Sequence, residues 1–205
     1  MLFRSGIQTC YQHTLREVRA ASREAVFDVR DGEAQREEVI RFDMLHVTPP
    51  MAAPDVVADS ALAVQGPGGW VEVDQYTTQH VRFANVFSLG DVSSLPNSKT
   101  AAAIRGQAPV LVDNLLAHLD GKPLPGRYDG YACCPLITGY GRTIMAEFNY
   151  KGEPVPSFPL DPTKERWSMW FVKRNLLPAL YWNRMLRGYL HERRFMPGLA
   201  SSQHP

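Results

Sequence analysis

The residues with the clearest capacity for redox chemistry are three cysteines, Cys10, Cys133 and Cys134. Three cysteines are too few for the disulfide framework of a small secreted protein, and none has zinc-ligand spacing with another Cys or a His. A thiolate is both a nucleophile and a leaving group, so such a thiol can take part in sulfur and electron transfer. The cysteines therefore indicate either a redox role or a buried structural role, and no metal site is predicted.

A second group of candidate residues follows an apolar run, Asn85 to Leu89, that ends in Gly90-Asp91. The run predicts a buried parallel strand, which would bring the Asp91 carboxylate to the edge of a sheet where doubly wound folds bind nucleotides. Asp91 could there accept a hydrogen bond from a ribityl hydroxyl. The positive end of the helix that follows would favour negative charge on a reduced isoalloxazine ring. An Asp that only caps a helix is the alternative interpretation.

Lys99 lies next to the expected start of that helix, where a cation could steady an anionic reduced flavin; a surface lysine is the alternative. The stretch from Thr78 to Asp91, with the Ala-rich segment after it, resembles the second FAD-binding motif of flavoproteins with two dinucleotide-binding domains. The Gly-x-Gly-x-x-Gly loop that holds the FAD pyrophosphate is absent, because the glycines at 66–69 have neither its spacing nor a strand before them. We therefore expect half of an FAD site.

Several elements must position these residues. In the N-terminal part, strands are expected at Gln8–His13, Ala25–Arg30, Glu37–Phe42 and Met44–Val47, with a turn at Asp31-Gly32. A helix over Ser98–Leu119, capped by Asn97 or Ser98, is expected to kink or split at Pro109. The C-terminal part is expected to form strands at Leu136–Ile137 and Thr143–Tyr150, then a helical segment over Lys164–Leu190 with a break near Pro178.

Charge is distributed unevenly along the 205 residues, although the net charge is only +1. Residues 164–194 carry a net charge of +6 and the remainder carries −5. The basic segment also holds aromatic residues at near-helical spacing, as an in-plane interfacial helix requires. A helix packed on the core or on another subunit is the alternative. An anionic membrane surface fits better than nucleic acid, because no nucleic-acid motif is present.

The run from Tyr128 to Tyr150, which contains Cys133-Cys134-Pro135, closely resembles sulfide:quinone oxidoreductases of the mitochondrial type. The match extends over about residues 40–190, through Leu95-Pro-Asn-Ser-Lys-Thr100, Lys164-Glu-Arg-Trp-Ser-Met169, Tyr181-Trp182 and Met185-Leu-Arg-Gly188.

The resemblance implies that Cys134, which precedes the proline, is the catalytic thiol and pairs with a second cysteine across the flavin. Sulfide would open that bridge and leave a persulfide, and two electrons would pass through FAD to quinone. Cys133 stands where the family usually has a non-cysteine residue, and Cys10 is expected to be structural. The partner cysteine is expected in an N-terminal portion that this chain lacks, so the chain alone is expected to be inactive.

The site residues follow from the motif and the resemblance together. The cofactor-binding candidates are Gly90, Asp91, Lys99 and Thr100, and the quinone-binding candidates are Phe148, Tyr150 and Trp170. The expected partners are sulfide, quinone, a sulfur acceptor such as a small thiol or sulfite, and the surface of a bacterial or mitochondrial inner membrane, where the protein would be peripheral. Homo-oligomerisation is left open.

The expected fold is α/β: an incomplete flavoprotein of two Rossmann-like dinucleotide-binding domains, with a C-terminal α+β region that ends in amphipathic helices. Residues 1–65 would be the remnant of the second, NAD-like domain, 66–127 part of the FAD domain, and 128–205 the quinone- and membrane-associated region. Two alternatives remain. One is an NADH:quinone oxidoreductase-like flavoprotein, which would need no thiol for hydride transfer. The other is a non-catalytic membrane-associated binding protein.

Overall fold

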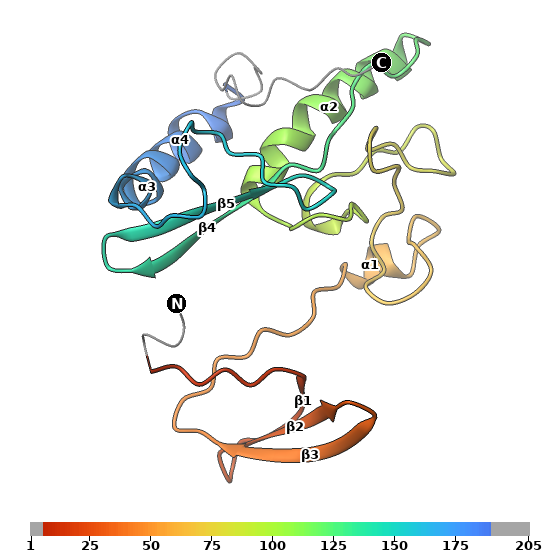
Figure 1. Ribbon diagram of the computed structural model, residues 1–205. Coiled ribbons are helices and arrows are strands. Elements are labelled where there is room, and N and C mark those ends of the chain that lie inside the picture. Colours follow the sequence, from red (N-terminus) through yellow and green to blue (C-terminus); the bar gives the residue numbers. More distant parts are fainter. Residues whose placement is uncertain (1–5, 190–205) are drawn as a thin grey trace. The chain divides into compact units, whose positions relative to one another are not determined.

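The computed structural model describes residues 6–189 (Figure 1). The chain divides between Pro50 and Met51 into two compact units. Unit 1 is a three-stranded antiparallel sheet, and unit 2 holds a long helix, a β-hairpin and a group of short helices. The coarse expectation of an α/β protein is met. The expected domain boundary after residue 65 does not coincide with the division at residue 50.

Unit 1 consists of β1 (His13–Arg19), β2 (Glu24–Asp31) and β3 (Ala34–Arg41), in the order β1-β2-β3. The predicted turn at Asp31-Gly32 joins β2 to β3, and Gly32 takes a φ of +61°, which a glycine adopts without strain. The predicted strand Gln8–His13 is wrong, because Gln12 turns the chain with a φ of +61° and β1 begins only at His13. Met44–Val47 is also irregular rather than a strand.

Unit 2 begins with the short helix α1 (Asp55–Ala58) and a long irregular segment that isolated bridges hold together. The predicted parallel strand at 85–89 is wrong. This stretch pairs antiparallel with the residues before it, through His80 N–H to Val86 O and Ser88 N–H to Thr78 O. A 3₁₀ turn, Gly90–Val92, follows it. Both sheets in the described part of the chain are antiparallel, so Asp91 does not stand at the edge of a parallel sheet.

The long helix α2 (Ala101–Leu119) is continuous through Pro109, so the expected split is wrong, while a kink at Pro109 stays a prediction. Packing of the buried face of α2 offsets the free-energy cost of a proline inside the helix. That face comprises Ala103, Gln107, Val110, Asn114 and Ala117. The helix also starts later than expected, because Thr100 is the N-cap residue. The Thr100 hydroxyl accepts a hydrogen bond from the Ala103 N–H at 3.2 Å.

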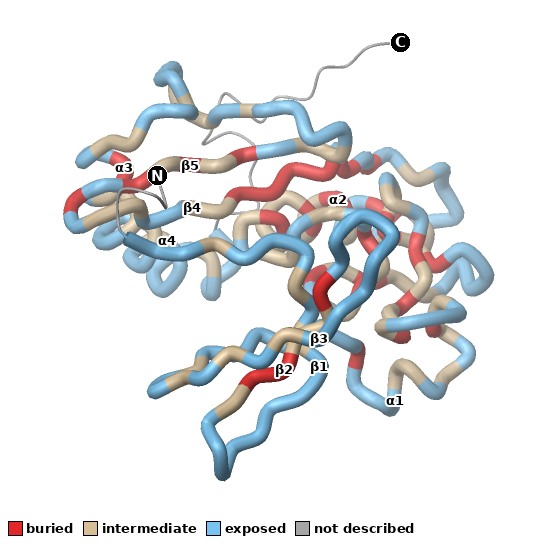
Figure 2. The backbone as a smooth tube through the Cα atoms, turned by 60° about the horizontal axis from the view of Figure 1, so that its bottom comes forward, coloured by how far each residue is buried: buried red, intermediate tan, exposed pale blue. Residues whose placement is uncertain are grey.

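The hairpin of β4 (Ala132–Gly139) and β5 (Arg142–Phe148) confirms the two strands expected in this region. Ala132 stands opposite Phe148, and Cys133 stands opposite Glu147. β4 packs on α2, and β5 packs on the short helix α3 (Trp167–Phe171). Figure 2 shows buried residues in α2, in the hairpin and in the irregular segment that precedes α2.

The last described elements are a π-helical turn, Val172–Leu176, the helix α4 (Leu177–Asn183) and a 3₁₀ turn, Met185–Arg187. The predicted break near Pro178 is not found: the chain changes to a π turn just before it, but the backbone stays helical into α4, whose first turn contains Pro178. Leu190, the expected end of the helical segment, lies outside the described residues. No helix within residues 6–189 is long and apolar enough to cross a membrane.

Candidate functional site

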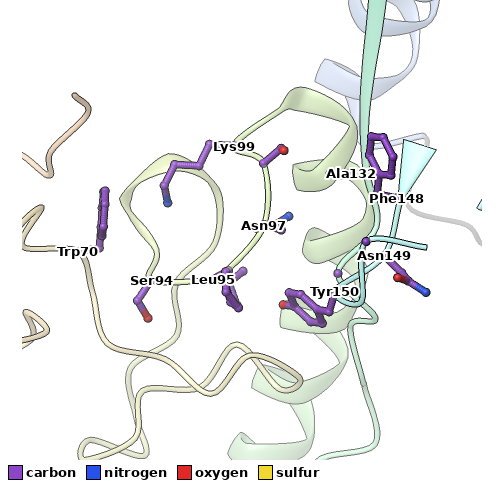
Figure 3. A pocket seen from close by; sticks show the side chains of 13 residues that line it. Trp70, Ser94, Leu95, Asn97, Lys99, Ala132, Phe148, Asn149 and Tyr150 are labelled. Carbon is purple, nitrogen blue, oxygen red and sulfur yellow. The ribbon is translucent and has the colours of Figure 1, made fainter. Parts of the chain in front are cut away.

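A pocket of about 600 Å³ lies in unit 2 between the loop before α2 and the end of β5 (Figure 3). Trp70 and Lys99 stand on one side, and Phe148, Asn149 and Tyr150 stand on the other. Three of the predicted site residues, Lys99, Phe148 and Tyr150, therefore line one cavity. They come from segments about fifty residues apart, which only the fold brings together.

Lys99 is a half-buried cation in the wall of this pocket. Its ammonium donates a hydrogen bond to the Ser93 carbonyl at 2.6 Å and lies 4.9 Å from the centre of the Trp70 ring. Burial lowers the pKa of Lys99 because it removes the ammonium from water, and the Asp91 carboxylate opposes this shift. The arrangement holds a positive charge beside aromatic surface, where an anionic or electron-rich ring would be stabilised.

The opposite wall is an aromatic cluster built around Tyr150. Its hydroxyl donates to the Gln75 carbonyl at 2.7 Å, and its ring contacts Tyr128 and Tyr76 edge to face, at centroid distances of 5.5 and 6.1 Å. Gly130 lies directly against this ring, since a Cβ atom there would be 2.2 Å from Tyr150 Cγ. The wall therefore depends on a glycine at 130.

The hairpin gives Cys133 and Cys134 different environments. Side chains alternate across a strand, so the adjacent thiols point to opposite faces. Cys133 is 5% exposed and belongs to the core of unit 2, whereas Cys134 is partly exposed. Cys134 shares its face with Ala132, a pocket-lining residue two positions earlier on the strand. Cys134 therefore lies on the pocket side of the hairpin, about 7 Å along the strand from Ala132.

A buried carboxylate stands beside Cys133. Glu147 is 4% exposed and accepts hydrogen bonds from the Tyr131 hydroxyl at 2.7 Å, the Ser157 N–H at 3.0 Å and the Ser157 hydroxyl at 2.5 Å. Burial, with the charge of Glu147, raises the pKa of the Cys133 thiol to about 12. Cys133 is therefore a protonated thiol near neutral pH.

The remaining predicted residues lie outside the pocket. Gly90 turns the chain with a φ of +74°, and its N–H donates to Gln107 Oε1 at 2.8 Å, while the Asp91 side chain is exposed beside this turn. Thr100 caps α2. Trp170 lines a different, open cleft of about 650 Å³ together with Tyr140 and Trp167. The structure therefore separates Trp170 from Phe148 and Tyr150.

Sequence reasoning missed Trp70, Asn97 and Tyr128. Trp70 has no motif around it, and its role comes from the stacking of Lys99 on its ring. Asn97 and Tyr128 stand inside segments that supported the family resemblance, but the hydrogen bond between them joins residues 31 positions apart in the chain. Cys10 was expected to be structural in a strand, yet it is exposed in the irregular segment before β1.

Comparison with known proteins adds independent information. No family model matches the sequence. The chain is 48% identical over 179 residues to the mitochondrial sulfide:quinone oxidoreductase of Mus musculus, covering 87% of this chain and 39% of that protein. The corresponding protein of Dictyostelium discoideum is 46% identical over 183 residues, covering 89% and 39%. That of Schizosaccharomyces pombe is 45% identical over 188 residues, covering 89% and 40%. The chain spans about two fifths of the length of these relatives.

A chain of the cryo-EM structure of the Tetrahymena thermophila mitochondrial ATP synthase, an F1Fo composite tetramer model, has a similar fold. The TM-score is 0.72 at 24% identity, and the match covers 96% of this chain and 45% of that chain. This likeness concerns the fold alone.

The fold and the site together define an α/β protein with a half-buried thiol on the same hairpin face as a lysine-containing aromatic pocket. The identities of 45–48% over nearly nine tenths of the chain add the family: the chain belongs to the sulfide:quinone oxidoreductases, a family of oxidoreductase enzymes, and corresponds to part of their length.

Proposed function

We propose that this chain supplies the redox cysteine and half of the flavin site to an enzyme that oxidises sulfide and reduces quinone. The observation that carries the proposal is the contrast between the two adjacent thiols. Cys134 is partly exposed on the pocket face, while Cys133 is buried beside Glu147 with a pKa raised to about 12. Of the two, only Cys134 is accessible to a nucleophile such as hydrosulfide.

The proposed reaction begins with a disulfide between Cys134 and a second cysteine. Hydrosulfide attacks one sulfur and the S–S bond breaks. The attacked sulfur becomes a persulfide, and the other cysteine leaves as a thiolate whose electron pair is the reducing equivalent. Cys133 does not suit the partner role, because it points to the opposite face of β4. The persulfide then passes its outer sulfur to a small thiol or sulfite, which returns its cysteine to a thiol. Re-formation of the disulfide between the two cysteines would release two electrons, which bound FAD would accept.

The residues of this chain fit a flavin at several points. The exposed Asp91 carboxylate can accept a hydrogen bond from a ribityl hydroxyl, and the N-terminal end of α2 favours nearby negative charge. Bound FAD would supply two-electron transfer between thiolate and quinone. The Lys99 ammonium, held by Ser93 and Trp70, would stabilise the anionic form of a ring beside it. Gly90 and Thr100 act indirectly, by shaping the turn and capping the helix.

The pocket of Lys99, Phe148 and Tyr150 is the proposed entry for the quinone ring. Its aromatic wall offers stacking surface, and the Lys99 ammonium can donate to a quinone carbonyl. Trp170 lies in the other cleft, among exposed apolar and basic side chains, where a membrane surface would be met. By analogy with the mitochondrial relatives, we assign the assembled enzyme to the mitochondrial inner membrane as a peripheral protein.

The direct test combines this chain with the remaining portion of a curated relative and follows flavin absorbance on addition of sulfide. The expected result is bleaching that Cys134→Ser abolishes. Cys133→Ser is the matched control and should retain bleaching within about threefold, because the buried thiol takes no part. Bleaching that survives in Cys134→Ser, or bound flavin that responds to NADH and not to sulfide, would contradict the proposal.

A further inference from the structure

The Tyr128 hydroxyl is a buried junction of hydrogen bonds. The residue is 3% exposed, and its hydroxyl accepts from Asn97 Nδ2 at 2.7 Å and donates to the Tyr131 carbonyl at 2.5 Å. The Gln107 side chain also hydrogen-bonds to it. A tyrosine hydroxyl has one donor and two acceptor positions, so these three partners use its full capacity.

Gln107 extends this junction to the turn at Gly90. The residue is 2% exposed, and its Oε1 accepts the Gly90 N–H at 2.8 Å. Because the carbonyl end of the amide is occupied by Gly90, the amide nitrogen is the donor to Tyr128. A continuous path of hydrogen bonds therefore runs from Gly90 through Gln107 to Tyr128.

The partners of this junction belong to three segments that matter for the proposed function. Gly90 belongs to the turn that presents Asp91, Asn97 lines the pocket beside Lys99, and Tyr131 stands three residues before Cys134. Burial also raises the pKa of Tyr128, so its hydroxyl stays protonated and remains a donor at any physiological pH.

We infer that Tyr128 is a positioning residue, whose hydroxyl holds the Gly90 turn, the pocket loop and the cysteine strand in one fixed arrangement. The inference rests on the proposed function only where it names Cys134 as the reacting thiol. Loss of the hydroxyl would leave the buried amide groups of Asn97 and Gln107 without an acceptor. The three segments would then no longer be joined by hydrogen bonds and could move independently.

The test uses the full 205-residue chain and the Tyr128→Phe variant, which keeps the ring and removes the hydroxyl. Hydrogen exchange at the Gly90 amide is expected to rise about tenfold, because Gln107 loses its anchor and the Gly90 bond opens more often. The rate of Cys134 alkylation by iodoacetamide, followed against pH, is expected to rise about threefold as the start of β4 loosens.

Tyr150→Phe is the matched control. It makes the same chemical change on a ring packed against Tyr128, but it removes a bond to Gln75 instead. Gly90 exchange should then stay within about twofold of the unsubstituted chain. Equal Gly90 exchange in Tyr128→Phe and Tyr150→Phe would overturn the inference.

A second variant separates coupling from general loss of stability and also serves if Tyr128→Phe does not fold. Gln107→Met removes the acceptor of Gly90 while it preserves side-chain length. Hydrogen exchange at the Gly90 amide should rise, and the rate of Cys134 alkylation should change although Tyr128 is intact. Adding Tyr128→Phe to Gln107→Met should raise Gly90 exchange no further, whereas two independent destabilisations would add. Additive effects contradict the inference. If iodoacetamide does not modify Cys134 in the unsubstituted chain, the proposed function is contradicted. Hydrogen exchange at the Gly90 amide would still test the inference about Tyr128.

Discussion

At the residue scale, burial divides two neighbouring thiols into one that can react and one that cannot. Native chain treated with iodoacetamide at pH 8 should be modified at Cys10 and Cys134 and spared at Cys133. A thiol whose pKa is raised to about 12 stays protonated far above neutral pH, and the thiolate is the nucleophile. Peptide mass spectrometry of the three sites measures this directly, with unfolded protein as the control in which all three react. Early modification of Cys133 would show that β4 does not bury it.

A second residue-scale prediction concerns the glycine behind the aromatic wall. Gly130→Ala should lower the free energy of unfolding by about 3 kcal/mol, because φ is +88° and the new Cβ would lie 2.2 Å from Tyr150 Cγ. Gly152→Ala is the matched control: φ is also positive, at +73°, but nothing lies within 4 Å. Its cost should be about 1 kcal/mol. Urea titration of both variants gives the comparison, and equal costs would mean that Tyr150 moves aside.

The sequence was informative about these residues to different degrees. The proline after Cys134 and the resemblance around it singled out that cysteine, and its catalytic role stays a prediction. The grouping of Lys99 with Phe148 and Tyr150 was not predictable, because local patterns do not reveal which distant segments enclose a cavity. The placement of Trp170 with them failed for the same reason, since it lines another cleft.

At the element scale, the helix α2 shows where local signals suffice. Its C-terminal end and its body follow from the Ala- and Leu-rich sequence, but several residues before it could serve as the cap. The structure selects Thr100, and packing of the buried face carries the helix through Pro109. The apolar run at 85–89 shows the opposite case. Its composition is typical of a buried strand, yet strand type depends on partners, and its neighbours here are antiparallel.

The cap of α2 supplies the element-scale prediction. Thr100→Ala should lower the free energy of unfolding by about 1 kcal/mol, because the Ala103 N–H loses its acceptor. Ser98→Ala, two residues earlier, is the control and should change stability by less than about 0.5 kcal/mol. Thermal melts followed by circular dichroism measure both. If Ser98→Ala proves the costlier change, the helix is capped at the position expected from sequence instead.

At the scale of the whole molecule, the C-terminal part of unit 2 exposes apolar side chains on neighbouring elements. The tip of the β4–β5 hairpin and the helices α3 and α4 contribute them, and α3 packs on β5. The exposed apolar residues are Leu136, Ile137, Tyr140, Trp167, Phe171 and Trp182. Basic residues follow the same segment, among them Arg142, Lys173, Arg174, Arg184 and Arg187. The sequence indicated the helical part of this surface, whereas the contribution of the hairpin tip required the structure.

Such a surface should bind vesicles that carry anionic lipid, through apolar insertion and electrostatic attraction together. The 205-residue chain is therefore expected to sediment with vesicles of mixed phosphatidylglycerol and phosphatidylcholine. It should bind pure phosphatidylcholine vesicles at least about tenfold more weakly, since only the apolar contribution then remains. Raising the salt concentration should weaken binding to the anionic vesicles, because salt screens the basic residues.

The variant Ile137→Ser/Trp167→Ser tests whether the hairpin tip and α3 act together on the membrane. Both side chains are exposed, at 60% and 63%, so their loss should leave folding intact while vesicle binding falls about tenfold. Leu119→Ser is the matched control, because Leu119 is 72% exposed at the C-terminal end of α2, away from the hairpin tip (Figure 1). Its vesicle binding should equal that of the unsubstituted chain. If the control loses as much binding as the double variant, adsorption is non-specific, and the exposed tip is better explained as a contact surface for another protein.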